Sequence, residues 1–150
     1  MSMGYSACFS EHIEDDNLKK VLGTDAGKLD ELKNLINKLS EDESTDDIVR
    51  WLDEEDASYL SDESVVETDD YRRLKTLWTE ISAKVKEETG LNLYINYHDS
   101  KNNGSSYDDL DGVFFDFHTK DLYQPTQAFL DMRKKFGDGI VTRHFFTEFG

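Results

Sequence analysis

The stretch TDDYRRLKTLWTEISAKVKEETGLNLYINYH, residues 68–98, changes its apolar period at Gly90. After Gly90, apolar and polar residues alternate from Leu91 to His98, which is typical of a strand with one buried face. Thr68 is expected to cap the preceding helix and Gly90 to end it. Before Gly90, apolar residues recur every three or four positions, as on one face of a helix: Tyr71, Leu74, Leu77, Trp78, Ile81 and Val85. This stripe is predicted to pack on Leu93, Ile95, Phe115 and Phe117.

The chain before this stretch is expected to hold one strand and three helices. Alternation at residues 4–10 predicts a short strand. Asp15 or Asp16 should cap a first helix that Gly23 ends, and Thr24 should cap a second helix that reaches about Ser40. Ser44 or Thr45 should cap a third, with Asp46 and Asp47 favourably placed at its N-terminus. Residues 53–67 are expected to be ordered only in part.

The chain after this stretch is expected to complete the sheet. Residues 113–118 should form a strand that pairs with the preceding one as a hairpin with a long loop. Pro125 suits the first turn of a helix that Gly137 would stop, and residues 140–149 should form a last strand. The predicted fold is an α+β domain with a mostly antiparallel sheet of about four strands and helices packed on a face.

Composition is typical of one globular domain that spans residues 1–150. Apolar residues make up 37% of the chain, which is enough for a core without disulfides. The single cysteine, Cys8, fits a reducing compartment and is expected to act as a small buried hydrophobe. No apolar run approaches the roughly 20 residues of a membrane span, and the first residues do not resemble a signal peptide. We therefore expect a cytoplasmic protein.

Charge is concentrated in a segment at residues 41–70, which we call the acidic segment. The net charge of the chain is −16, and the acidic segment holds fourteen acids against a single base, Arg50. Nucleic acids and anionic membranes need clustered Lys and Arg, so both are excluded as expected partners. A basic protein is a suitable partner, because the field of the acidic half would steer it.

Aromatic residues among the acids suggest more than a solubilising surface. Interface energy concentrates on aromatic side chains, and the charges would serve mainly to speed encounter. The hypothesis is a binding module, such as an inhibitor or immunity-type protein, that docks on a basic protein. The alternative is a solvated acidic surface with no partner. The residues expected to bind the partner are Asp46, Asp47, Trp51, Asp53, Glu54, Glu55, Asp56 and Tyr59.

A different hypothesis is a small metal-dependent or hydrolytic enzyme that uses histidines of the sheet. His98, Asp116, His118 and His144 all lie on predicted strands. If the strand register brings them together, they could bind a divalent metal or form a His–Asp general base. The alternative is that they are polar residues on the solvated face of a half-buried sheet. A third hypothesis is a structural or homo-oligomeric domain.

No cofactor or metal is predicted. The loops DSKNNG at 99–104 and YDDLDG at 107–112 depart from the EF-hand pattern at essential ligand positions. The sequence lacks the glycine-rich motifs that cradle nucleotide phosphates and lacks a Cys/His zinc cluster. The acidic segment therefore carries the strongest functional signal in the sequence.

Overall fold

The computed structural model describes residues 5–99, 112–118 and 127–149, and for residues 5–10, 118 and 143–149 it describes the backbone alone. Four strands form one sheet in the order β2-β3-β1-β4, and every neighbouring pair is antiparallel. Their bounds are β1 Tyr5–Ile13, β2 Tyr94–His98, β3 Gly112–His118 and β4 Thr142–Phe149. The first strand of the chain thus lies inside the sheet, between β3 and the last strand.

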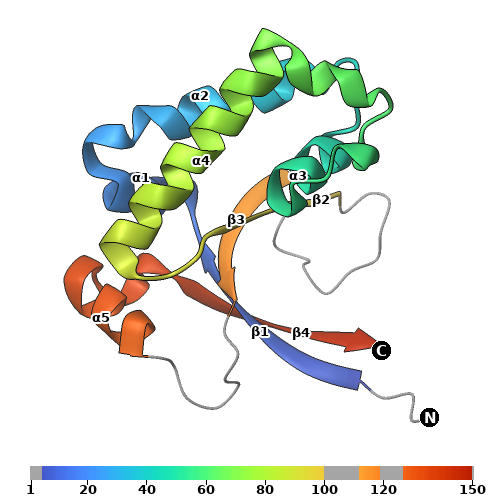
Figure 1. Ribbon diagram of the computed structural model, residues 1–150. Coiled ribbons are helices and arrows are strands. Elements are labelled where there is room, and N and C mark those ends of the chain that lie inside the picture. Colours follow the sequence, from blue (N-terminus) through green and yellow to red (C-terminus); the bar gives the residue numbers. More distant parts are fainter. Residues whose placement is uncertain (1–4, 100–111, 119–126, 150) are drawn as a thin grey trace.

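Five α-helices accompany the sheet in the described ranges. Figure 1 shows α1 to α4 together on one side of the sheet, with α5 near one end of it. The bounds are α1 Asp15–Leu22, α2 Gly27–Leu39, α3 Thr45–Glu54, α4 Asp69–Thr89 and α5 Gln127–Phe136. Short 3-10 helices lie at η1 Gly23–Asp25, η2 Ala57–Tyr59, η3 Glu63–Glu67 and η4 Asp138–Ile140. The α+β class with an antiparallel sheet is therefore confirmed.

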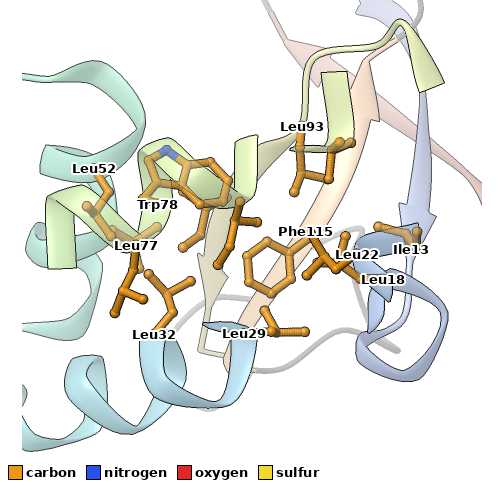
Figure 2. Close-up of a cluster of buried hydrophobic side chains, with 14 of the residues drawn as sticks. Ile13, Leu18, Leu22, Leu29, Leu32, Leu52, Leu77, Trp78, Leu93 and Phe115 are labelled. Carbon is orange, nitrogen blue, oxygen red and sulfur yellow. The ribbon is translucent and has the colours of Figure 1, made fainter. Parts of the chain in front are cut away.

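The core forms where α4 crosses the sheet, as the apolar period predicts. Every residue of the predicted α4 stripe is buried, and so are Leu93, Ile95, Phe115 and Phe117. The Trp78 ring stacks on the Phe115 ring, with centroids 6.0 Å apart and an interplanar angle of 26°. Figure 2 shows these two rings with Leu29 and Leu32 of α2 in one cluster. The α4 helix thus joins the helical layer to the sheet.

Several predicted boundaries are wrong by a few residues. Glu14, and not Asp15 or Asp16, is the N-cap residue of α1, and both aspartates lie in its first turn. Thr24 does not cap α2: residues 23–25 form η1, and α2 begins after Ala26. The strand β1 continues past Ser10 to Ile13, while Ile140 belongs to η4 and β4 begins at Thr142. Gly90 ends α4 as predicted, in the left-handed conformation with φ 73° that glycine adopts most easily.

Residues 53–67, which the sequence left undecided, form the end of α3 and the two short helices η2 and η3. Asp56 and Asp62 each cap one of them, since their carboxylates accept hydrogen bonds from the backbone N–H groups of Ser58 and Ser64 at 2.9 Å. Pro125 and the loops at 99–104 and 107–112, apart from Asp99 and Gly112, lie outside the described residues. Within the described ranges, no helix is both long and apolar enough to cross a bilayer.

Strand register assigns residues to the two faces of the sheet. Ile13 and Ile95 both pair with Phe115, and all three are buried on the face that the helices cover. One position along, His12, Asp116 and Tyr94 form a row on the opposite face. The register thus decides which of the histidines can lie near Asp116.

Candidate functional site

The acidic segment presents most of its carboxylates to solvent. Ten acids are exposed: Glu41, Asp42, Asp53, Glu54, Glu55, Asp56, Asp62, Glu63, Glu67 and Asp69. Asp46 and Asp47, in the first turn of α3, are half-buried. Six of the eight residues predicted to bind a partner are therefore carboxylates of this segment, and four of those six are exposed.

The apolar pattern of α3 explains this exposure. Ile48, Val49 and Leu52 are buried on one face of the helix, which turns Asp53 and Glu54 toward solvent. The Ser44 hydroxyl accepts a hydrogen bond from the Asp47 backbone N–H at 3.4 Å, so Ser44 caps the helix as predicted. The chain then leaves α3 through Glu55, which has a left-handed backbone with φ 57°.

Four ion pairs in the described residues involve carboxylates of the acidic segment. Arg50 pairs with Asp46 at 3.1 Å and Lys75 with Glu55 at 2.8 Å. Arg72 pairs with Glu67 at 2.7 Å, and Lys38 pairs with Asp70 at 2.9 Å. Fourteen acids thus face these four cations, and the surface keeps a large negative excess.

Local hydrogen bonds favour the ionised carboxylates. The Lys75 ammonium lowers the pKa of Glu55, and hydrogen bonds from Ser58 and Ser64 lower the pKa values of Asp56 and Asp62. All three groups are exposed, so these interactions fix local geometry more than they add stability. These interactions thus favour the ionised form of Glu55, Asp56 and Asp62.

Trp51, one of the two aromatic residues expected to bind a partner, is mostly buried, and its role in binding stays a prediction. Its side chain is 7% exposed, and its ring meets the Tyr71 ring edge-to-face with centroids 5.4 Å apart. The reason is its position on α3: Trp51 falls on the same face as Ile48 and Leu52, which packs into the core. Trp51 is therefore mainly a core residue that shows one edge to solvent.

Tyr59, the other predicted anchor, lies in η2 and is half-buried. The Arg50 guanidinium lies 5.7 Å from its ring centroid, in a cation–π arrangement. A hydrogen bond with the Glu54 carboxylate raises the pKa of the Tyr59 hydroxyl. Tyr59 is thus a partly exposed aromatic residue held in place by its charged neighbours.

A groove of about 510 Å³ lies where α3, η3 and α4 meet. Its lining residues are Trp51, Glu55, Val66, Arg72, Lys75 and Thr76, and we call it the α3–α4 groove. Val66 is half-buried against the core, and the edge of Trp51 adds a second apolar surface. The groove therefore places an apolar floor inside the most acidic part of the surface.

A second hollow, of about 360 Å³, lies between the start of α3 and the end of β2. Its lining includes Asp46 and Arg50 from α3 and Tyr97, His98 and Asp99 from β2 and its end. Polar side chains dominate it. His98, which the sequence grouped with Asp116, belongs to this hollow.

The proposed set of His98, Asp116, His118 and His144 is not brought together as a whole. Tyr94 pairs with Asp116, and His98 lies four residues further along β2, about 13 Å away at roughly 3.3 Å per residue. His118 of β3 and His144 of β4 both pair with Ser10, so they lie in one row of the sheet on either side of β1. The side chains of His118 and His144 lie outside the described residues, so their convergence stays a prediction.

The histidine that the register places beside Asp116 is His12. Asp116 is 1% exposed and accepts a hydrogen bond from the Asn96 side chain at 2.8 Å. The His12 Nδ1 atom lies 3.1 Å from the Phe115 carbonyl oxygen, a hydrogen bond that would leave Nε2 as the acceptor nitrogen. Among the side chains that the structure describes, no three His, Cys, Asp or Glu residues form a group able to hold a metal.

Sequence reasoning missed His12 and the α4 side of the groove. His12 was passed over because the predicted strand ended at Ser10. Arg72, Lys75 and Thr76 share one side of α4 at spacings of three and four, which is a detectable signal. That they meet α3 follows only from tertiary packing.

Comparison with protein-family models, with curated proteins and with solved structures finds no match for this chain.

Proposed function

We propose that this chain is a protein-binding module whose acidic segment docks on a basic protein surface, as an inhibitor or immunity-type protein does. The observation that carries the proposal is the imbalance on one surface: fourteen carboxylates, ten of them exposed, beside four paired cations. Such a surface attracts positively charged partners and speeds their association.

The fold uses only part of this charge, as in the Asp56 and Asp62 caps and the Lys75–Glu55 ion pair. The residues that tie α3 to the core are apolar, and the exposed acids point away from it. Like charges so close together repel and destabilise the compact state. A charge density that costs stability and serves no packing role supports a function in recognition.

The class of partner follows from the sign of the charge. Phosphate backbones and anionic lipids would be repelled, which leaves a protein rich in Lys and Arg. We place the encounter in the cytoplasm, because a chain with a single cysteine fits a reducing compartment.

The test compares two variants that each remove three charges. The acid-triple variant carries Glu41→Gln, Asp53→Asn and Glu63→Gln, all exposed positions of the acidic segment. Glu54, Glu55 and Asp56 are left intact, because Glu54 bonds to the Tyr59 hydroxyl, Glu55 pairs with Lys75 and Asp56 caps η2. The control-triple variant carries Asp16→Asn, Glu87→Gln and Asp138→Asn, which are exposed and lie outside the segment.

Both variants and the wild type are immobilised and exposed to an extract of the source cell at low and high salt. A basic protein should be retained at low salt by the wild type and by the control-triple variant, and much less by the acid-triple variant. With the purified partner, the association rate should fall steeply as the screening length drops from about 10 Å at 0.1 M salt to about 3 Å at 1 M. Equal retention by all three proteins, or association indifferent to salt, would refute the proposal.

A further inference from the structure

We infer that the α3–α4 groove receives an apolar side chain of the basic partner, so that the partner binds through an amphipathic segment rich in Lys and Arg. This inference rests on the proposed function. It names the part of the surface that slows dissociation of the partner, whereas the exposed charges speed its association. Exposed charges contribute little to the stability of a complex, so a tight complex needs a desolvated contact as well.

The floor of the groove supplies that contact. The edge of Trp51 and the half-buried side chain of Val66 are both anchored in the core, so they are already ordered before a partner arrives. A preordered apolar surface loses little conformational entropy on binding. The methylene stems of Arg72 and Lys75 extend the apolar surface at the sides.

The cations of the groove are already paired within the chain. Lys75 bonds to Glu55 at 2.8 Å and Arg72 to Glu67 at 2.7 Å, and both carboxylates are mostly exposed. The groove is thus close to neutral, which argues against an anionic ligand and favours an uncharged side chain. Two exposed ion pairs beside an apolar floor resemble the polar rim that surrounds an interface hot spot.

Charge complementarity selects the rest of the occupant. Asp53, Glu63 and Asp69 are exposed, and each lies two or three residues along the chain from a residue that lines the groove. A segment that places an apolar side chain in the groove therefore meets carboxylates with its flanking residues. An amphipathic helix or turn with interspersed Lys, Arg and large apolar residues has this chemistry.

The test uses two synthetic peptides of equal length and equal positive charge. The first places leucines and one tryptophan every three or four positions among lysines, as on one face of a helix, and the second has serine at every apolar position. Each is titrated into isotope-labelled protein and followed by NMR, with the Trp51 indole N–H and the Val66 and Thr76 amides as reporters. The first peptide should bind the wild type about tenfold tighter or more, since burying one large apolar side chain is enough for that factor.

Two tryptophan substitutions on α4 locate the contact. Thr76 and Thr79 are both exposed, but only Thr76 lines the groove. Thr76→Trp should fill the groove and remove the difference between the peptides, whereas Thr79→Trp should preserve it. Circular dichroism and thermal unfolding verify that both variants fold.

The outcomes separate this inference from the proposed function. If both peptides bind equally, or if Thr76→Trp leaves their difference intact, the groove is not the anchor site. In that case the acid-triple variant can still weaken both peptides, and the proposed function stands. If neither peptide binds, and the acid-triple variant retains as much basic protein from the extract as the wild type does, the proposed function fails as well.

Discussion

Trp78 is the residue on which the packing of α4 against the sheet depends most directly. It is 7% exposed and stacks on Phe115 of β3. Trp78→Ala should lower the free energy of unfolding by about 3–5 kcal/mol, through lost burial and the cavity that remains. Denaturant unfolding measures this, and Thr79→Ala at the next, exposed position should change stability by about 0.5 kcal/mol or less. A loss below about 1 kcal/mol for Trp78→Ala would contradict the packing described.

Arg133 makes the second residue-scale prediction. It extends from α5 to the fully buried Glu11 of β1, and its Nη2 atom lies 3.3 Å from both carboxylate oxygens. Arg133→Met should destabilise the fold by about 2–3 kcal/mol, somewhat less than a fully buried pair because Arg133 is 26% exposed. Lys134→Met, on the exposed side of the same helix, is the control for lost positive charge. Equal effects of the two changes would show that the ion pair does not secure α5.

Single residues also show where sequence reasoning ends. Trp51 stands in a run of acids, so composition suggested exposure, although helical spacing placed it with Ile48 and Leu52. The spacing was the better guide, because side chains on one face of a helix share one environment. Glu11 is the reverse case: nothing local marks it as buried, since its partner Arg133 lies 122 residues away along the chain.

At the scale of the element, the caps predicted for α3 and α4 differ. The Ser44 hydroxyl accepts a hydrogen bond from the Asp47 N–H at the start of α3. Thr68 precedes α4, but its hydroxyl donates to the Val65 carbonyl at 2.6 Å, and α4 has no side-chain cap bond. Ser44→Ala should therefore cost about 1 kcal/mol. Thr68→Ser keeps the hydroxyl and should cost less, about 0.5 kcal/mol at most.

Thermal or denaturant unfolding of the two variants checks this contrast. Thr68→Ala completes the set, because it removes the hydrogen bond to Val65 and leaves the N–H groups of α4 as they are. A loss for Thr68→Ala with no loss for Ser44→Ala would mean that the end of η3, rather than the start of α3, is the segment that depends on a hydroxyl.

Elements with a long apolar period were predicted well, and those without one were not. The stripe of α4 and the stop at Gly90 follow from local chemistry alone. The short helices η2 and η3 have too few residues for a period, and their aspartate caps resemble ordinary turn residues in the sequence. Register could not be predicted either, because a long hairpin loop does not fix which residues pair. This is why His98 was grouped with Asp116 and His12 was missed.

At the scale of the whole molecule, the sequence predicted the acidic segment but could not predict the α3–α4 groove. Charge counts are additive along the chain, whereas the groove needs α3, η3 and α4 to be packed together. Lys75 and Arg72 illustrate this, because their carboxylate partners Glu55 and Glu67 lie on other elements. The location of a charged surface is thus readable from sequence, while its shape depends on tertiary structure.

The net charge of −16 makes the stability of the whole molecule depend on salt. Long-range repulsion among the carboxylates destabilises the fold, while exposed ion pairs such as Arg73–Glu31 contribute little to stability. Repulsion should dominate, because the described residues provide cation partners for four of the fourteen acids in the acidic segment. The melting temperature at pH 7 should therefore rise as salt increases from about 0.02 M to about 0.5 M, over which screening becomes strong.

Added salt should raise the melting temperature, whereas acid should lower the stability that the paired carboxylates provide. Ion pairs lower the pKa values of Glu31, Glu55 and Glu88 in the folded chain, so the unfolded chain binds more protons near pH 4. Their contribution to stability is present above the unfolded pKa and is lost as the pH falls through the folded pKa. The melting temperature measured below about pH 5 should therefore fall through the loss of these pairs, whereas between pH 7 and pH 5 these three carboxylates should contribute little change.

The acid-triple variant separates the two effects. At pH 7 and low salt, it should melt at a higher temperature than the wild type, because it removes three charges from the most crowded surface and leaves the Lys75–Glu55 ion pair intact. The control-triple variant should gain less, and both gains should shrink at high salt, where repulsion is already screened. If salt instead lowered the melting temperature of the wild type, the ion pairs would outweigh the repulsion. The charge of the acidic segment would then not reduce stability. The stability cost that supports a function in recognition would be absent.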